Sequence, residues 1–319
     1  TQGIVANCSG MIDADQTPFA KIIGKTANED LVVFAHSKSK KKAKLIEFDN
    51  DLHYKSEINL AFEDEIIQYC TVIDGKIIVF SAKVIENTNF LLARNYEDYE
   101  FSEPKVICKT QFINSVFDFA KSQNDKYLGI IAETPYLKGK NEEIELWIFD
   151  SLLNEQLNYS LALTEKNTRV KINVPVMSNS GVLFLIKRHT IAQDNNYFVY
   201  SINPHTKKHQ RKSLTLMGKR IADLKYQLDT ENNLYLTGFF SAQNYHVFQG
   251  FFYYKLDQNS RALDFKQNNF DAGFLIQAEG KKNAKKHGGL LNYKMGVMQL
   301  FQGKTYFTAS HTLREKYTI

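Results

Sequence analysis

Histidine is the first side chain to consider, because it is the usual metal ligand and acid–base group in proteins. Three histidines end or follow short apolar runs that recur along the chain, namely His36, His189 and His311. If those runs are corresponding strands of a repeat, the three rings come to one face of the fold. They belong to separate repeats, however, and the ligands of one zinc ion must converge to about 2.1 Å from it. His205 and His209 lie in NPHTKKHQ, which has no helical character to aim both rings at one point. We expect no metal site and no cofactor.

Paired carboxylates are the next candidates, since glycoside hydrolysis uses two of them at a defined separation. Acidic residues adjoin one another at Glu63-Asp64-Glu65 and at Glu142-Glu143. Both stretches are predicted to be turns between strands, where a solvated charge is the ordinary state. The sequence also lacks Gly-x-Ser-x-Gly and any glycine-rich phosphate loop. No residue is therefore assigned a catalytic role.

The three cysteines, Cys8, Cys70 and Cys108, are an odd number in a long chain and do not indicate a disulfide framework. At most one bridge can form. None of the three has a histidine close in sequence, and buried, unreactive thiols are the expected outcome.

Two lysine-rich runs stand out, SKSKKKAK from residue 37 and GKKNAKKHGG from residue 280. Neither contains an aromatic residue, and the formal charge of the chain is only +5, so nucleic-acid binding is not expected. The second run lies in a predicted insertion, 267–291, between two strand-like segments. Apolar residues come first in this insertion and lysines follow. This order suits docking to a partner protein, and an anionic surface is the other candidate partner. The predicted contact residues are Phe274, Leu275, Lys281, Lys282, Lys285 and Lys286.

The composition indicates which elements position these residues. The chain has 319 residues, of which 43% are hydrophobic and 24% charged, as in globular proteins. Phe (23) and Tyr (17) are abundant and Pro (5) is scarce, which favours strands. No apolar stretch approaches 18 residues, so no transmembrane helix is predicted.

A repeat of about fifty residues runs along the chain. Apolar runs such as LVVFA, KIIVFSA and GVLFLIK are each followed by a second, aromatic run that ends in Asp or Asn, as in KLIEFDND and FFYYKLDQN. The fifth unit contains four strand-like runs between residues 222 and 265. Four antiparallel strands per repeat are typical of a β-propeller blade. Two stacked β-sandwiches remain an alternative, whereas a transmembrane barrel fits poorly because the runs are continuously apolar.

We therefore predict an all-β fold, a single β-propeller domain over 1–319 with about six four-stranded blades. The blades are expected to start near residues 19, 66, 113, 169, 221 and 292. The last has room for two or three strands and is either incomplete or closed by an N-terminal strand near Gly3 to Asn7. Second strands of blades are covered on both faces, so their apolar side chains should be buried. This prediction covers Val32, Phe34, Ile78, Phe80, Ile130, Val182, Phe184, Leu234 and Leu236.

The C-terminal part carries a more specific pattern, Gly238-Phe239-Phe240-Ser241, then Lys255-Leu256-Asp257, a lysine-rich insertion, and a strand-like segment from Tyr293 to Leu300. It resembles a family of uncharacterised secreted proteins of Bacteroidota, of flavobacterial type, with a propeller-type repeat. The resemblance covers about ninety residues. It implies export and supplies no catalytic residue, since no reaction is known for the family.

These observations favour a non-catalytic interaction or structural subunit of the bacterial cell envelope, in the periplasm or at the cell surface. A role in an outer-membrane secretion or uptake complex would fit. The first residues, TQGIVANCSG, contain no signal peptide, which leaves a cytoplasmic protein and an already cleaved one both open. Whether the protein is an enzyme is also open, and two alternatives remain: a propeller-fold glycan hydrolase or lyase, and a sugar-binding propeller without turnover.

Overall fold

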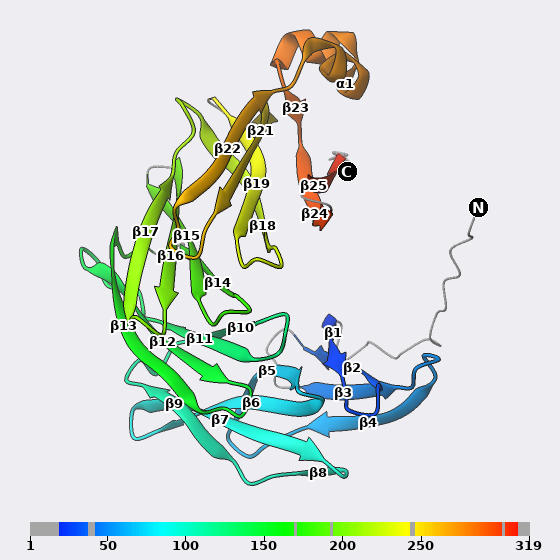
Figure 1. Cartoon of the computed structure of the whole chain (residues 1–319), viewed down its shortest axis with the longest axis vertical. Helices are drawn as coiled ribbons and strands as arrows, with labels where there is room; N and C mark the ends of the chain where they lie inside the picture. The colour runs from blue at the N-terminus through cyan, green and yellow to red at the C-terminus, as the bar shows by residue number, and fades with distance from the viewer. Residues whose placement is uncertain are drawn as a thin grey trace, which may run out of the picture. The chain divides into compact units, whose positions relative to one another are not determined.

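A computed structural model describes residues 19–37, 42–168, 171–191, 194–242, 246–301 and 304–311 (Figure 1). The chain divides into two compact units, an N-terminal unit, Thr1–Thr164, and a C-terminal unit, Glu165–Ile319. Strands make up most of the described structure of both units, and the described part of the chain contains one helix, α1 (Ala272–His287). No helix in that part is long and apolar enough to cross a membrane.

The N-terminal unit contains three sheets whose strands neighbour one another largely in sequence order. The first comprises β1 (Phe19–Lys25), β2 (Leu31–His36), β3 (Ala43–Phe48) and β4 (Tyr54–Leu60). The second comprises β5 (Ile66–Ile73), β6 (Lys76–Ile85) and β7 (Thr88–Glu97), with β8 (Glu100–Phe101) and β9 (Lys105–Thr110) both paired to β7. The third comprises β10 (Phe117–Lys121), β11 (Tyr127–Glu133), β12 (Asn141–Asp150) and β13 (Glu155–Lys166), whose end passes the unit boundary.

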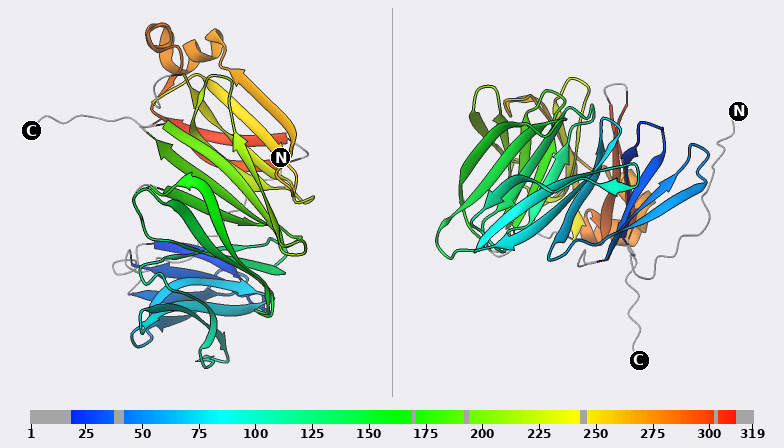
Figure 2. Two further views of the ribbon diagram at one scale, coloured as in Figure 1. Left: turned by 90° about the vertical axis from the view of Figure 1, so that its left-hand side faces the viewer. Right: turned by 90° about the horizontal axis from the view of Figure 1, so that it is seen from below.

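The C-terminal unit contains two four-stranded sheets (Figure 2). One comprises β14 (Lys171–Met177), β15 (Leu183–Ile191), β16 (Asp194–Asn203) and β17 (Lys208–Leu214). The other comprises β18 (Arg220–Leu228), β19 (Leu234–Ser241), β21 (Gly250–Leu256) and β22 (Ala262–Asn269). Two short sheets follow, β20 (Val247–Phe248) with β23 (Leu290–Leu291), and β24 (Tyr293–Phe301) with β25 (Lys304–His311).

Sheets of four sequential antiparallel strands are the blades of a β-propeller, and the predicted all-β, propeller-type fold is confirmed. The first strands of the sheets begin at Phe19, Ile66, Phe117, Lys171 and Arg220, and the β24–β25 pair begins at Tyr293. The number of blades and the single domain over 1–319 stay predictions. The predicted closing strand near Gly3 to Asn7 lies outside the described residues.

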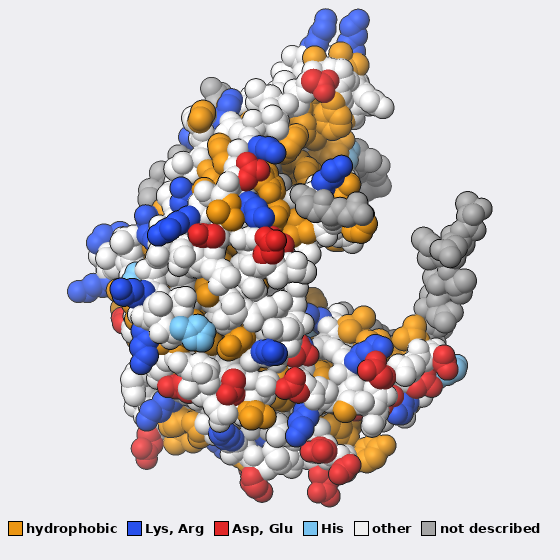
Figure 3. Space-filling view, in the orientation of Figure 1, with side chains coloured by type: hydrophobic (Ala, Val, Ile, Leu, Met, Phe, Trp, Pro, Cys, Tyr) orange, Lys and Arg blue, Asp and Glu red, His pale blue; other side chains and the backbone are white. Residues whose placement is uncertain are grey.

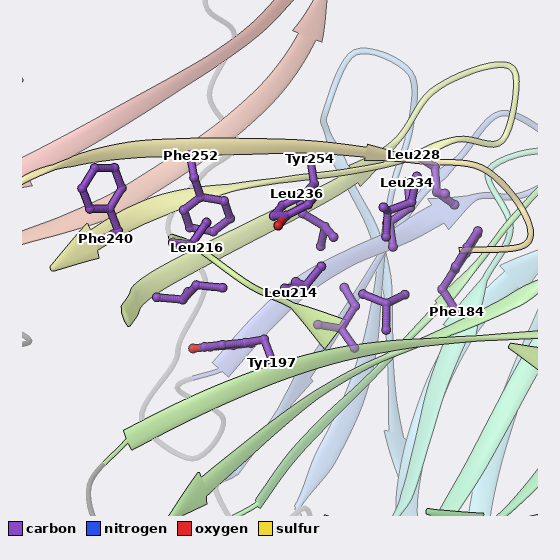
Figure 4. Packing of buried hydrophobic residues seen from close by; sticks show 14 of the residues in the cluster. Phe184, Tyr197, Leu214, Leu216, Leu228, Leu234, Leu236, Phe240, Phe252 and Tyr254 are labelled. Atoms are coloured by element: carbon purple, nitrogen blue, oxygen red, sulfur yellow. The ribbon is translucent and has the colours of Figure 1, made fainter. Parts of the chain in front are cut away.

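The second strands carry the core, because both of their faces are covered. All nine residues predicted to be buried there are buried, and even Phe34, the most accessible of them, is only 5% exposed. In the C-terminal unit, Phe184 of β15 and Leu236 of β19 belong to one cluster that also holds Phe252 of β21 (Figure 4). This cluster joins the two four-stranded sheets of that unit.

An acidic or amide side chain closes the hairpin after the third strand in several sheets, and we call these turns the Asx-closed hairpins. The carboxylates of Asp49, Asp150 and Asp257 each accept hydrogen bonds from the backbone N–H groups two and four residues further on, at 2.8–2.9 Å. Asn203 accepts one at 2.9 Å from the N–H of His205. At these four positions, the Asp or Asn at the end of an aromatic run is therefore a turn residue that holds the backbone in place.

The predicted insertion, 267–291, is not an irregular loop. Strand β22 continues to Asn269, and α1 then begins after Asp271, whose side chain accepts a hydrogen bond from the N–H of Phe274. The helix ends at Gly288, which has the left-handed conformation (φ 62°) of a common C-terminal cap. The sequence did not predict this helix, because Gly280 interrupts it with a non-helical φ of 77° and few of its side chains are apolar.

Candidate ligand-binding pocket

The C-terminal unit contains a cavity of about 540 Å³. It lies among strands β19, β21 and β22, the first half of α1, and the β24–β25 pair. Six aromatic residues form most of its wall: Phe239, Phe251, Phe270, Phe274, Tyr293 and Phe307. Asn269 and Asp271 contribute polar groups. A largely apolar cavity of this volume with a few polar groups is typical of a ligand-binding site.

Phe239 lies in the wall of this aromatic cavity and packs against three other aromatic rings. Its ring centroid lies 4.9 Å from that of Phe248, 5.8 Å from that of Phe307 and 6.0 Å from that of Phe270. The last two pairs are edge-on, an arrangement that aromatic rings prefer. Phe239 is only 1% exposed, so the wall is held by a fully packed side chain.

The first turn of α1 positions Phe274 at the edge of the cavity. Asp271 fixes this turn, because its side chain accepts a 2.8 Å hydrogen bond from the N–H of Phe274 and its carbonyl accepts one at 3.1 Å from Leu275. Leu275 is buried in the underlying core cluster. Phe274 remains 42% exposed, with its ring 5.1 Å from that of Phe270. The buried leucine thus anchors the helix while the phenylalanine faces the cavity.

Two further hydrogen bonds attach the walls of the cavity to one another. Glu279 of α1 accepts a 2.9 Å hydrogen bond from the N–H of Leu291, and Asp223 of β18 accepts one at 3.0 Å from the N–H of Met295. Met295 is 1% exposed. The helix is therefore fixed to β23, and the β24–β25 pair to β18 of the four-stranded sheet.

The four predicted lysines lie beyond Gly280 in the second half of α1, and all four are exposed. Figure 3 shows blue side chains at the outer end of this helix and hydrophobic side chains gathered beneath it. Lys285 and Lys286 lie in the last turn, where the helix dipole favours positive charge. Of the predicted contact residues, Phe274 lines the cavity, Leu275 is core, and the lysines form a separate basic surface. Their role in binding stays a prediction.

Three of the five histidines that the sequence singled out, His36, His209 and His311, have aromatic neighbours. The ring of His36 lies 5.6 Å from that of Phe19 and 5.0 Å from that of Phe34. His189 is buried, and His209 lies 6.4 Å from the ring of Tyr200. His205 follows Asn203 in a hairpin, and His311 packs 5.1 Å from Tyr293. No group of three or more His, Cys, Asp or Glu side chains within the described ranges could hold a metal ion.

The acidic pairs are not all solvated, and the prediction is wrong for two of them. Glu65 is buried and accepts two hydrogen bonds from the guanidinium of Arg94, at 2.6 and 2.8 Å. Glu142 lies inside strand β12 and is fully buried. The predicted turn is wrong for Glu142 and Glu143, which belong to β12, whereas Glu63-Asp64-Glu65 does lie in the turn between β4 and β5. Glu65 is covered there although it lies in a turn. Glu63 and Asp64 are exposed, as expected.

Cys70 and Cys108 are buried, as predicted, and Cys8 lies outside the described residues. Cys108 lines a second cavity, of about 490 Å³, in the N-terminal unit. Glu145, Glu155 and Trp147 also line it. Burial raises the pKa of the Cys108 thiol well above its ordinary value, and the two nearby carboxylates add to this effect. Cys108 is therefore a protonated, weakly nucleophilic thiol. Sequence reasoning missed this cavity, because its residues come from four different strands.

No protein-family model matches this chain, and no curated protein matches it either. Among solved structures, it is similar to the propeller of Dos1, with 13% identity and a TM-score of 0.47 over 79% of this chain and 61% of that one. It is also similar to the β-propeller domain of the Trilobed protease from Pyrococcus furiosus, with 11% identity and a TM-score of 0.46 over 92% and 79% of the two chains. An acylaminoacyl peptidase of Pyrococcus horikoshii matches with 10% identity and a TM-score of 0.49. The match covers 92% of this chain but only 43% of that peptidase. The assignment of blades rests on the sheets of this chain itself.

Proposed function

We propose that this protein is a non-catalytic interaction subunit that captures a protein partner through the aromatic cavity and the lysine-bearing half of α1. The partner presents an aromatic or large apolar side chain, flanked in its sequence by acidic residues. The observation that carries this proposal is the position of one exposed aromatic ring, Phe274, at the edge of an aromatic cavity, on the same helix as four exposed lysines.

The aromatic cavity and the exposed lysines contribute to binding in different ways. Buried aromatic anchors in preformed pockets contribute most of the binding energy at protein interfaces. Exposed lysines contribute mainly to the rate of association and to the choice of an acidic partner, and salt screens their effect. Because Leu275 and Ala284 hold both halves of α1 to the core, a partner would meet a prearranged surface.

The cell envelope remains the proposed location, as a subunit at the periplasm or cell surface in an outer-membrane secretion or uptake complex. The support for it is the resemblance of residues 232–265 and of the following segments to secreted proteins of Bacteroidota. Glycan turnover and sugar binding without turnover stay alternatives. Any glycan-active site would need two carboxylates beside an aromatic surface, and the cavity lined by Glu145, Glu155 and Trp147 is where we would look for one.

The test uses a labelled acidic peptide with one central tryptophan, titrated into the whole chain and followed by fluorescence anisotropy. We expect Phe274→Ala to weaken binding about tenfold, because the aromatic contact is lost. Lys281→Glu/Lys282→Glu should weaken it by a similar factor at low salt and by less at high salt. The matched control is Lys207→Glu/Lys208→Glu, an exposed pair in the β16–β17 hairpin of the same unit.

A peptide with alanine in place of the tryptophan should bind weakly to every variant. Equal affinity of Phe274→Ala and the unaltered chain would exclude the cavity as the binding site. An equal loss in the Lys207/Lys208 control would show that only the overall charge matters.

A further inference from the structure

Besides the cavity lined by Cys108, the N-terminal unit contains another cavity, of about 340 Å³, at one end of its first two sheets. Three turns surround it: the β1–β2 turn, the β5–β6 turn, and the turn after β7. Glu47 of β3 and Lys55 of β4 complete the wall. None of these residues belongs to the aromatic cavity, so the inference below is independent of the proposed function.

The turns around this cavity are joined directly. The N–H of Ala27 in the first turn donates a 3.0 Å hydrogen bond to the carbonyl of Gly75 in the second. Gly75 has a φ of 75°, and a Cβ atom at this position would lie only 2.7 Å from the backbone nitrogen of Ala27. Glycine is required here both by the conformation and by the close approach of the chain. The two turns are therefore held together by their own backbone.

The cavity is acidic although the chain as a whole is basic. Five carboxylates line it, from Asp30, Glu47, Asp74, Glu97 and Asp98. Only two lysines do so, and one of them, Lys55, is paired with Asp30 at 2.6 Å. The whole chain has a formal charge of +5. A cleft lined by charge of one sign concentrates the field and attracts ligands of the opposite sign.

Tyr96 is a second observation, independent of the carboxylates, that points to a ligand. The residue lines the cavity and is 7% exposed, yet its hydroxyl has no hydrogen-bond partner among the described residues. Burial raises the pKa of Tyr96, and the nearby charge of Glu47 adds to this, so the hydroxyl keeps its proton at neutral pH. A buried polar group without a partner destabilises the fold. A ligand that reaches this oxygen removes that destabilisation.

Tyr99 completes the site at its rim. Its side chain is 79% exposed, and its backbone is held at a φ of 67°, which is unusual for a non-glycine residue. An exposed aromatic ring next to carboxylates is a favourable surface for a cation, because the ring face is electron-rich.

We propose that this cavity binds the basic side chain of a peptide ligand, a lysine ammonium or an arginine guanidinium. The cationic nitrogen donates hydrogen bonds to the Tyr96 oxygen and to the carboxylates of Glu97 and Asp98. The methylene groups of the ligand lie against Tyr99 at the rim. The protein thus has a receptor site for a positive group in the N-terminal unit, in addition to the surface for an acidic partner in the C-terminal unit.

The experiment measures binding of a fluorescein-labelled tetra-arginine peptide and a tetralysine peptide to the whole chain by anisotropy. Two variants test the site, and both preserve side-chain shape: Tyr96→Phe and Glu97→Gln/Asp98→Asn. The matched control is Glu86→Gln, an exposed carboxylate in the turn at the other end of the same β-sheet. Thermal unfolding of each variant checks that the fold is retained.

We expect the unaltered chain to bind at least one of the two peptides, with an affinity that falls as salt rises. Tyr96→Phe should weaken binding about threefold, through the loss of one hydrogen bond. Glu97→Gln/Asp98→Asn should weaken it about tenfold and reduce the salt dependence. Glu86→Gln should leave the affinity within about twofold of the unaltered chain.

Undiminished binding by either cavity variant in a folded protein would overturn the proposal. It would also be overturned if neither peptide bound at low salt, or if a neutral tetrasaccharide bound more tightly than both peptides. The last result would instead assign the cavity to a polyhydroxylated ligand. None of these outcomes bears on the aromatic cavity, because the variants lie in the other unit.

Discussion

Arginines that pair with buried glutamate side chains recur in the two units. In the N-terminal unit, the guanidinium of Arg94 makes two hydrogen bonds to Glu65 and lies 4.1 Å over the ring of Phe62. In the C-terminal unit, Arg211 donates two hydrogen bonds to Glu165, at 2.6 and 3.0 Å. Each carboxylate is thus compensated by a planar cation, the arrangement that makes a buried charge tolerable.

The charge of Glu65 depends on this pairing. Burial by itself would raise the pKa of Glu65, but the hydrogen bonds from Arg94 and Ser81 outweigh it and lower the pKa below its ordinary value. A carboxyl whose pKa is lower in the folded state stabilises the fold above its unfolded pKa, about 4.3. That contribution is lost as the pH falls through the folded pKa.

We predict that Arg94→Met lowers the free energy of unfolding by about 3 kcal/mol at pH 7, because it leaves a buried carboxylate without its cation. The loss should shrink as the pH falls below about 5, since Glu65 in the variant can then take up a proton. Urea denaturation of both proteins between pH 7 and pH 4 measures this difference.

The control for this prediction is Lys25→Met, which breaks the exposed ion pair between Lys25 and Glu29. It should cost less than about 1 kcal/mol at any of these pH values. A loss in Arg94→Met that is equally small, or that does not change with pH, would show that the buried pair does not stabilise the fold.

At the scale of the elements, the Asx-closed hairpins place a residue with positive φ just before the fourth strand. This residue is Leu52 in the first sheet (φ 64°), Leu153 in the third (φ 59°) and Ser260 in the sheet formed by β18, β19, β21 and β22 (φ 56°). A leucine in the left-handed region costs about 1–2 kcal/mol, whereas asparagine tolerates it. Two of these turns therefore carry a strained residue.

We predict that Leu52→Asn raises the free energy of unfolding by about 0.5–1 kcal/mol, because the left-handed conformation suits asparagine. Leu52→Ala is the matched comparison, since it removes the same side chain but keeps a residue that disfavours positive φ. The midpoint of urea denaturation should be higher for Leu52→Asn than for Leu52→Ala. Equal midpoints would mean that the turn conformation contributes nothing measurable.

The strands could be predicted from the sequence because their signal is local. The continuous apolar runs identified the second strands, and the Asp or Asn after each aromatic run marked a turn. Helix α1 could not be predicted in this way, since within it only Leu275 and Ala284 are buried and Gly280 breaks its periodicity. Its attachment depends on contacts with β23 and with the neighbouring four-stranded sheet, which no local pattern encodes.

At the scale of the whole molecule, each unit has its own hydrophobic clusters. Phe80 belongs to a cluster that lies entirely in the N-terminal unit, and Phe184 to one that lies entirely in the C-terminal unit. Both side chains are 0% exposed. A cavity made in one cluster should therefore weaken mainly the unit that contains it.

We predict that Phe80→Ala and Phe184→Ala each cost about 3–5 kcal/mol of unfolding free energy. Hydrogen exchange followed by mass spectrometry should show faster exchange mainly in Thr1–Thr164 for the first variant and mainly in Glu165–Ile319 for the second. Uniformly faster exchange along the chain in both variants would mean that the units unfold together, as the predicted single domain implies.

Of the two candidate binding sites, the residues of one could be found from the sequence and those of the other could not. Phe274 and the lysines of α1 were found because they are adjacent in sequence and differ in composition from their surroundings. The acidic cavity was not found, because Asp30, Gly75 and Tyr96 come from two separate turns and the end of a strand, which only the fold brings together. A buried hydroxyl without a partner is likewise a property of the packed structure and leaves no mark on the sequence.

The Asx-closed hairpin also bears on how such a chain can evolve. Because Asp49, Asp150 and Asp257 complete their turns with groups from the same few residues, each hairpin is independent of its neighbours in the chain. A gene segment encoding one four-stranded sheet could then be duplicated or deleted without the need for new turn sequences. Between duplications, the faces and the other turns of each sheet are free to diverge, and that is where the cavities of this protein lie.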